Sequence, residues 1–452
     1  MAKLAFIDRW ADLHSVVHRC QQDGALVRYC VRTSKPEHAR IGDGIVAKVK
    51  SLDALLRWRP DALVAYQSPD EAATARAEGI PTWGSSETSR LLEEDRVAAL
   101  RLARASGLSV STTREFTSMD AAYAFLTSTP IEGWVFKAEG ADNACDSTRV
   151  CESKDAAFAA LESASTAKNF VLQEIVQGVE VSTEGWFDHR VGWLHPFNST
   201  LERKRLMAGD VGPNVGCMGS IVWAWPDDAR LPREVLLPHT AYLDRARYVG
   251  PFDVNSIIGR CSLCGHDHEP DTPHWLEYSP RLGWNAFEAL MVGMPEGALA
   301  DFIVALAHGD ATTVPFTRKD YAAAIRVYTK KSPNVPLIAP WRANPHVFIK
   351  DVYFDGRTLR TTGTDTDCGF TVVFEVAATG STVWDATRAI YKQHLPKLTV
   401  PSPTYRTDIG EHAQQDLYRL MELGYIGLEA STAVEAQPAM PAVALERASR
   451  SA

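Results

Sequence analysis

Short apolar runs alternate with amphipathic segments over the first hundred residues, and this alternation limits the possible folds more than any other feature. The strand-like runs are residues 4–8, 25–31 and 62–66, and the helix-like segments are residues 10–23, 52–58 and 86–106. Strands that alternate with helices form parallel sheets, because a helix carries the chain back between strands. We therefore predict a Rossmann-like α/β domain over residues 1–110.

The middle of the chain has a different pattern, which predicts an α+β arrangement. Helices are expected at 115–128 and 154–163, and strands at 133–140, 169–178, 179–188 and 190–198. A further α/β stretch begins near residue 310 and ends near Tyr425. Residues 428–452 are rich in Ala, Pro, Ser and Glu without an apolar period, so we expect a disordered tail.

Composition excludes several classes of protein. The 452 residues are 45% hydrophobic and 23% charged, as in ordinary globular proteins. The formal net charge of −9 argues against direct nucleic-acid binding, which depends on cationic side chains. No apolar run is long enough to span a bilayer, and Asp8 and Arg9 interrupt the N-terminus too early for a signal sequence. With eight scattered cysteines, we expect a cytoplasmic protein without a membrane partner.

Residues 200–219 (TLERKRLMAGDVGPNVGCMG) concentrate glycine, proline and asparagine. This composition predicts a loop rather than a helix or a plain strand, with backbone N–H groups open to a ligand. Lys204 and Arg205 stand just upstream and are suited to hold phosphate. The alternative is a surface turn with a basic flank.

Two strand-like segments carry polar residues at alternate positions. In PFDVN (251–255), Asp253 and Asn255 share a face, and so do Glu277 and Ser279 in LEYSPRLG (276–283). Paired strands would bring these oxygen ligands together for Mg²⁺, with Arg281 beside them for phosphate. The alternative is a hairpin with a solvated polar face.

Lys137 lies within the apolar strand segment VFKAEG (135–140). A lysine in such a place usually has a partner, and an anionic ligand is one candidate. The alternative is a side chain that reaches out to solvent.

Five motifs in order resemble the phosphoribosylamine–glycine ligase family of the ATP-grasp superfamily. They are VFKAEG (135–140), VLQEIVQGVE (171–180), GDVGPNVGCMG (209–219), LEYSPRLG (276–283) and YRTDIG (405–410). The resemblance covers about residues 85–427. It implies an N-terminal domain (1–110), an ATP-grasp lid (111–178), an ATP-grasp core (179–310), a small C-terminal domain (311–427) and a tail (428–452).

The resemblance also implies a role for each matching residue. Lys137, Gln173, Glu174, Val176, Glu180 and Arg205 would bind ATP; Glu277, Ser279 and Asn255 would bind Mg²⁺. Arg281, Lys204 and Asn214 would take part in catalysis, and Asp210, Gly212, Pro213, Asn214, Gly216 and Met218 would form the substrate loop. The implied reaction is attack of a carboxylate on ATP to give an acyl phosphate, from which an amine displaces phosphate.

Two departures from the family concern its substrate. The family's glycine-rich G-x-G-G-R-E-H turn is replaced by residues 8–14 (DRWADLH), and its R-F-G-D-P-E by residues 281–286 (RLGWNA). Three functions stay open: a carboxylate–amine ligase with altered substrates, the purine-pathway ligase itself, and a non-catalytic nucleotide-binding relative. We favour the first. Trp10 and Trp284 indicate an amine on a nucleotide or modified base, with an amino acid such as glycine as the acid. The alternative for both tryptophans is a place in the core.

A separate motif, CSLCGHDH (261–268), predicts structural zinc. Cys261 and Cys264, with His266, His268 or the nearby His274, would supply four ligands to a tetrahedral Zn²⁺ ion. The alternative is a metal-free hairpin.

We expect about one zinc per chain in protein purified without chelator, because four protein ligands close such a site. Elemental analysis of the full chain measures it. A metal-free protein of unchanged thermal stability would contradict the prediction.

Overall fold

The N-terminal region forms a parallel sheet, as the alternating pattern predicts. The computed structural model describes residues 1–138, 148–164, 169–261, 271–317, 320–366 and 368–427. Strands β1 (Lys3–Asp8), β2 (Leu26–Val31), β3 (Ala62–Tyr66) and β4 (Thr82–Gly84) lie in the order β2-β1-β3-β4. The helices of this region are α1 (His14–Gln22), α2 (Pro36–Ala39), α3 (Leu52–Arg57) and α4 (Pro69–Ala77). The strand order reverses between β1 and β3, where open α/β sheets bind ligands.

The single helix expected over 86–106 is wrong, because the chain forms two helices there. They are α5 (Glu87–Glu94) and α6 (Arg96–Ala105). Asp95 between them has extended backbone angles (φ −103°, ψ 95°), and its side chain accepts a hydrogen bond from Ala98 N. An aspartate in this position caps a new helix instead of continuing the old one.

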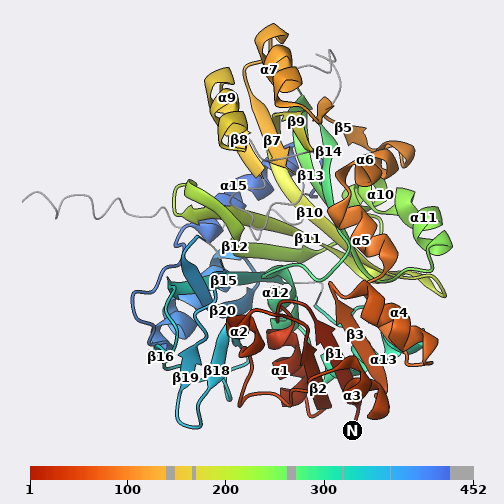
Figure 1. Cartoon of the computed structure of the whole chain (residues 1–452), viewed down its shortest axis with the longest axis vertical. Helices are drawn as coiled ribbons and strands as arrows, with labels where there is room; N and C mark the ends of the chain where they lie inside the picture. The colour runs from red at the N-terminus through yellow and green to blue at the C-terminus, as the bar shows by residue number, and fades with distance from the viewer. Residues whose placement is uncertain (139–147, 165–168, 262–270, 318–319, 367, 428–452) are drawn as a thin grey trace, which may run out of the picture.

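A small antiparallel sheet with two helices projects at one end of the molecule (Figure 1). Its strands are β6 (Thr113–Phe116), β7 (Trp134–Ala138), β8 (Thr148–Cys151) and β9 (Phe170–Glu174), in the order β6-β9-β7-β8. Its helices are α7 (Met119–Ser128) and α9 (Lys154–Ser163). The first helix begins later than expected because Ser118 caps it by accepting a hydrogen bond from Ala121 N. The side chains between sheet and helices form a separate apolar core.

A nine-stranded sheet joins the middle and the C-terminal part of the chain (Figure 1). Its order is β17-β20-β15-β12-β11-β10-β13-β14-β5. The strands are β5 (Ser109–Val110), β10 (Val176–Asp188), β11 (Gly192–Met207), β12 (Val211–Ala224), β13 (Val249–Cys261), β14 (Thr272–Ser279), β15 (Tyr321–Lys330), β17 (Val347–Ile349) and β20 (Phe370–Gly380). One sheet therefore crosses the boundary expected at residue 310.

The remaining elements cover this sheet or connect its strands. Helices α12 (Ala286–Val292), α14 (Val383–Ala389) and α15 (Ile409–Glu422) pack on it. The others are α10 (Arg230–Val235), α11 (Thr240–Arg245), α13 (Ala298–His308) and a small sheet of β16 (Pro336–Leu337), β18 (Val352–Phe354) and β19 (Leu359–Thr361). Within the described ranges, no helix has the length and apolar character to cross a membrane.

The loop expected over residues 200–219 is wrong, because most of it belongs to the β11–β12 hairpin. Only Gly209, Asp210 and Gly212 have positive φ angles, of 76°, 53° and 85°. They form the turn and the start of β12, and register shifts near Arg205 bend β11. The glycines therefore serve a tight hairpin with bulges rather than an open loop.

A buried arginine ties the tip of this hairpin to the C-terminal helix. Arg406 is fully buried and bonds Asp210 Oδ1 at 2.6 Å and Asp408 Oδ1 and Oδ2 at 2.8 and 2.7 Å. Asp408 also accepts a hydrogen bond of 2.8 Å from Gly209 N. The YRTDIG segment therefore holds the hairpin in place.

We expect Arg406→Leu to lower the free energy of unfolding by about 2–3 kcal/mol. This is less than the 3–5 kcal/mol of a fully buried pair, because both aspartates keep some contact with solvent. Chemical denaturation measures the change. Arg419→Leu, at an exposed ion pair with Glu422, is the control and should cost at most about 1 kcal/mol. Equal losses of stability in both variants would contradict the role of Arg406 in holding the hairpin in place.

Candidate active site

A cavity of about 510 Å³ opens between the small sheet and the nine-stranded sheet. Among the residues expected to bind ligands, it is lined by Lys137, Gln173, Glu174, Val176, Glu180, Lys204, Asn214, Gly216, Asn255, Glu277, Ser279 and Arg281. A smaller cavity of about 110 Å³ shares Lys137, Gln173, Glu277, Ser279 and Arg281. The structure therefore brings together residues that lie as far as 144 positions apart in sequence, from Lys137 to Arg281.

The polar pairs of the two strand segments face one another across β13 and β14. Asp253 pairs with Ser279, and Asn255 pairs with Glu277. Asn255 Nδ2 donates to Asp253 Oδ2 at 3.2 Å, which leaves the amide oxygen of Asn255 as a further acceptor. Asp253 and Asn255 are each 5% exposed, so this is not the solvated face of a hairpin.

Lys137 is buried in β7, being 8% exposed, and it lines the cavity. Burial lowers the pKa of its ammonium group to about 8, and Glu277 opposes this shift. Within the described residues no hydrogen bond or ion pair involves its Nζ atom. A desolvated cation without a close partner is suited to bind an anion.

Lys204 forms an ion pair with two carboxylates of the cavity. Its Nζ atom lies 2.7 Å from Glu180 Oε1 and 3.9 Å from Glu277 Oε1. Burial alone would lower the pKa of Lys204, but the carboxylates of Glu180, Glu277 and Glu202 raise it well above its usual value. Lys204 is therefore a permanent cation at the centre of an acidic wall.

Arg281 lies where two hollows meet. It lines the 510 Å³ cavity and a second crevice of about 490 Å³ at the carboxyl ends of β1, β3 and β4. Its Nε atom donates to Glu93 Oε1 at 2.6 Å, and its guanidinium lies 5.1 Å from the Trp284 ring. A group bound to Arg281 would therefore be accessible from both cavities.

The indole of Trp284 packs among polar and charged side chains. Its Nε1 atom donates to Tyr66 Oη at 3.1 Å, and the Arg326 guanidinium lies 5.4 Å from its ring. A Cβ atom at Gly216 would lie 2.4 Å from the indole, so glycine is required there. The indole therefore forms a packed wall of the cavity.

Several predicted residues lie away from the cavity. Asp210, Gly212 and Pro213 are exposed at the hairpin tip. Arg205 donates to the carbonyl of Gly212 at 2.8 Å. Met218 is buried in a separate apolar cluster with Tyr328. Of the expected substrate loop, only Asn214 and Gly216 line the cavity.

Four charged residues that sequence reasoning did not assign also line these hollows. They are Glu93, Arg96, Glu115 and Glu202. Asp253, which the strand period singled out together with Asn255, lines the larger cavity. Glu93 and Arg96 lie on helices far from the motifs, and no local pattern indicates them.

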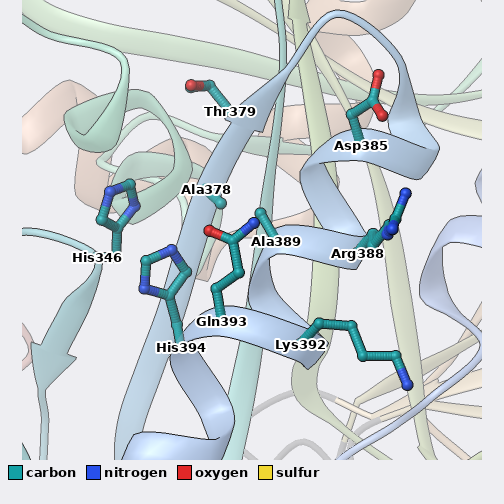
Figure 2. A pocket seen from close by; sticks show the side chains of 9 residues that line it. All are labelled: His346, Ala378, Thr379, Asp385, Arg388, Ala389, Lys392, Gln393 and His394. Carbon is teal, nitrogen blue, oxygen red and sulfur yellow. The ribbon is translucent and has the colours of Figure 1, made fainter.

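A wider hollow of about 750 Å³ beside α14 does not form a comparable site. The imidazoles of His346 and His394 stack there with centroids 4.1 Å apart. Figure 2 shows Arg388 and Lys392 extending from the helix away from this pair. Its polar groups therefore do not converge.

The zinc residues Cys264, His266 and His268 lie outside the described residues, as does the side chain of Cys261. His274 lies on β14, where its Nδ1 atom is 3.1 Å from Ser109 Oγ. In the described part of the chain, no group of three His, Cys, Asp or Glu side chains is placed to hold a metal ion.

Comparison with known proteins relates part of this site to a known domain family. Residues 97–235 match the ATP-grasp (A) domain of phosphoribosylglycinamide synthetase. Phosphoribosylamine–glycine ligase of Caulobacter vibrioides is 25% identical over 393 residues, 82% of this chain and 87% of that protein. The trifunctional purine biosynthetic protein adenosine-3 of Drosophila melanogaster is 23% identical over 83% of this chain, which spans only 29% of that protein.

Solved structures show the same fold. Phosphoribosylamine–glycine ligase from Thermotoga maritima matches with a TM-score of 0.67 at 18% identity, covering 90% of this chain and 99% of that one. Biotin carboxylase from Campylobacter jejuni matches with a TM-score of 0.62 at 12% identity, covering 96% and 99%. Residues 97–235 are therefore similar to the ATP-grasp domain of carbon–nitrogen ligases, and the chain as a whole is similar to phosphoribosylamine–glycine ligases.

Proposed function

We propose that this enzyme joins a small carboxylate to an amine other than phosphoribosylamine, through an acyl phosphate formed with ATP. The nucleotide half of the site keeps the charged residues that the reaction needs. The turn that would hold the ribose phosphate in the family does not keep its chemistry.

The turn after β1 is filled by its own carboxylate, and this observation carries the proposal. Asp8 is fully buried and accepts hydrogen bonds from the backbone N–H groups of Trp10, Ala11 and Leu13, at 2.8, 3.1 and 2.7 Å. The hydroxyl of Tyr29 donates to the same carboxylate at 2.8 Å. The backbone N–H groups that this turn could donate to a phosphate therefore already donate to Asp8.

A phosphate at this turn would lose its binding donors and meet a buried acidic group. Helix N-termini and glycine-rich turns bind phosphate because their N–H groups are exposed and can be approached closely. Here Asp8 takes the place of the anion, and Trp10 and Ala11 stand where the family motif has glycine. This turn therefore lacks the free backbone N–H groups that would bind the ribose phosphate.

The 510 Å³ cavity is the proposed ATP site. Gln173, Glu174 and Val176 would frame the adenine, and Lys137 would hold the phosphates. The oxygen donors of Asp253, Asn255 and Glu277 on adjacent strands fit a hard cation such as Mg²⁺. Bound Mg²⁺ would neutralise charge on the transferring phosphate.

Arg281 would stabilise the charge that develops as the carboxylate attacks the γ-phosphate, since it faces both hollows. The amine would enter through the 490 Å³ crevice, beside Arg9, Trp10 and Gln67. We propose an amino acid such as glycine as the acid. Trp10 lines this crevice and would contact an amine on a nucleotide or modified base, whereas Trp284 packs against Gly216 as a wall of the other cavity.

The direct test measures ADP release with a panel of amino acids and amine acceptors, including glycine with phosphoribosylamine. We expect turnover with another amine and little with phosphoribosylamine. Catalytic efficiency of about 10⁴ M⁻¹s⁻¹ or more with glycine and phosphoribosylamine would overturn the altered-substrate proposal. No ADP release with any pair would favour a non-catalytic relative.

We expect Lys137→Ala to weaken Mg-ATP binding by about 1.5–3 kcal/mol, the range for a hydrogen bond to a charged group. Calorimetry measures the dissociation constant. Lys154→Ala, at the first residue of α9 and outside the cavity, is the matched control. Unchanged affinity in Lys137→Ala would contradict the assignment of this cavity.

Affinity for Mg-ATP should also fall as pH rises above 8. Burial lowers the pKa of Lys137 to about 8 in the free protein, and a bound phosphate would raise it. Binding then takes up a proton above pH 8, which costs about tenfold in affinity per pH unit. The affinity of the Lys137→Ala variant should not fall in this way above pH 8. If the affinities of both proteins fall equally steeply with pH, the assignment of the pH dependence to Lys137 is wrong.

A further inference from the structure

We infer that the acceptor is an amino acid, free or carried on a modified base, and that Arg9, Gln67 and Ser85 bind its carboxylate. The inference rests on the proposed ligase function and names the chemical class of its acceptor. The three residues line the 490 Å³ crevice, which also reaches Arg281. This anion site is formed by side chains and does not use the backbone N–H groups that donate to Asp8.

The three side chains start from neighbouring strand ends. Arg9 directly follows β1, Gln67 follows β3 and Ser85 follows β4. Strand β3 pairs in parallel with β1 on one side and with β4 on the other, so the three carboxyl ends meet at one edge of the sheet. Adjacent strands lie about 4.8 Å apart, which brings all three residues within reach of one small ligand. The strand order also reverses here, between β1 and β3.

Each of these side chains has a hydrogen-bond donor that no described residue accepts from. The guanidinium of Arg9 has no hydrogen bond or ion pair there, and it lies 5.2 Å from the centre of the Trp10 ring. The amide of Gln67 has no hydrogen bond either, and its Oε1 atom is buried. Ser85 is 8% exposed, and its Oγ atom accepts from Ser68 N at 3.1 Å, which leaves its hydroxyl hydrogen to donate. Together these donors suit the two oxygens of a carboxylate.

The backbone at Gln67 supports a role in binding. Its φ angle is 47°, in the left-handed region that glycine adopts freely and glutamine rarely does. Residues held in such a conformation cluster at ligand sites, where the surrounding structure compensates for the strain. A glutamine at this position therefore supplies its side chain to the crevice rather than easing the turn.

Most charged groups along the crevice are paired with one another. The ion-pair distances are 3.2, 3.3 and 2.6 Å for Arg32 with Glu71, Arg90 with Glu94, and Arg281 with Glu93. Of the charged residues that line the crevice, Arg9 and Asp70 have no ion pair within the described ranges. One cation and one anion are therefore left, which is the pattern that a zwitterion complements.

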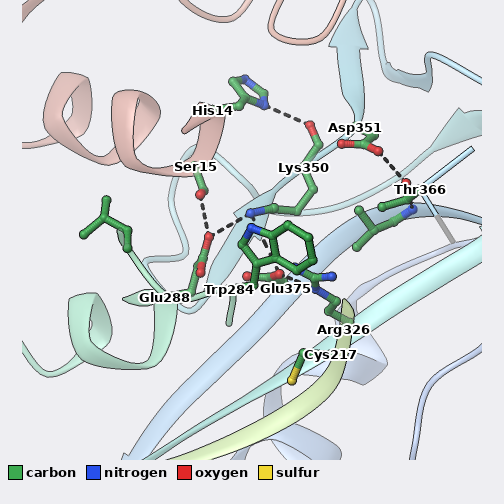
Figure 3. A network of polar contacts seen from close by, with 12 residues as sticks. His14, Ser15, Cys217, Trp284, Glu288, Arg326, Lys350, Asp351, Thr366 and Glu375 are labelled. Carbon is green, nitrogen blue, oxygen red and sulfur yellow. Dashed lines mark hydrogen bonds and ion pairs between the residues drawn. The ribbon is translucent and has the colours of Figure 1, made fainter. Parts of the chain in front are cut away.

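The charged groups beside Trp284 offer no comparable donor. Figure 3 shows Lys350 directed toward Glu288, and Arg326 directed toward Glu375. These pairs are 2.9 and 2.7 Å long, and both cations are buried. A ligand carboxylate would therefore find its free donors in the crevice and not in this network.

The charge balance of the crevice favours a carboxylate over a phosphate. Four arginines and four carboxylates line it, so its formal net charge is zero. An amino acid is a zwitterion without net charge at neutral pH, and it keeps this balance. A phosphate would bring two negative charges close to four carboxylates and one unpaired guanidinium. The crevice therefore selects an amine that carries a carboxylate.

The test first identifies the acid without using any acceptor. Hydroxylamine traps acyl phosphates as hydroxamates. The full chain is incubated with Mg-ATP, hydroxylamine and each standard amino acid in turn. If no acid gives hydroxamate, the proposed function fails, and the inference fails with it.

With the acid identified, the standard amino acids are compared as acceptors, and the products are assigned by mass spectrometry. The best acceptor is then compared with its carboxamide and its phosphonate analogue, which keep the amine. We expect catalytic efficiency at least about tenfold lower with both analogues, because the carboxamide loses the charge that Arg9 binds and the phosphonate adds one. If hydroxamate forms but no amino acid accepts, or if either analogue equals the amino acid, the inference is wrong and the proposed function stands.

Variants assign the effect to the crevice. Arg9→Gln should raise the KM for the amino acid at least about tenfold, while the KM of the acid in the hydroxamate assay stays near wild type. Gln67→Met keeps the length of the side chain and should raise the same KM by a smaller factor, because it removes a neutral donor. Arg9→Lys should recover part of the loss.

Arg57→Gln is the matched control, since Arg57 is an exposed arginine at the end of α3 and outside the crevice. It should behave as wild type with every acceptor. A wild-type KM for the amino acid in Arg9→Gln would overturn the carboxylate site. An equal loss with the carboxamide would do the same, because the carboxamide has no charge for Arg9 to bind.

Discussion

The register of β13 between β10 and β14 decides which polar side chains face the 510 Å³ cavity. Asp253 lies opposite Glu184 on one side and Ser279 on the other, and Asn255 lies opposite Ser182 and Glu277. A slip of one residue would turn each of these groups to the other face of the sheet. The face proposed to bind Mg²⁺, the ion pair of Lys204 with Glu180 and Glu277, and the position of Arg281 all follow from this alignment.

Local patterns predicted the parts of the site that depend on one strand. The period of two places Asp253 with Asn255 and Glu277 with Ser279, because side-chain direction alternates along any strand. Partners that come from distant segments have no such signal. Glu93, which bonds Arg281, is 188 residues away on α5, and only the fold brings them together. In the sequence, Asp95 looks like one more polar residue of a long helix, so the break between α5 and α6 was not predicted.

The glycine-rich segment shows a different limit. Clustered glycine and proline indicate that some residues need unusual backbone angles, but not how many. Only three residues between Met207 and Pro213 have positive φ, and the turn between the two strands is only residues 208–210. Fold class and the order of elements were therefore predictable, since they depend on periodicity. The extent of the hairpin was not, because it depends on pairing with β15, which lies about a hundred residues further along the chain.

The turn after β1 explains why the proposed substrate differs from that of the family. Asp8 points inward and accepts hydrogen bonds from three backbone N–H groups, so the turn keeps the backbone shape of an anion site and fills it with its own carboxyl group. Arg281 lines both cavities and is bonded to Glu93, not to this turn. The proposed change of substrate therefore lies in the turn, while the charged groups that the proposed phosphoryl transfer needs stay in place.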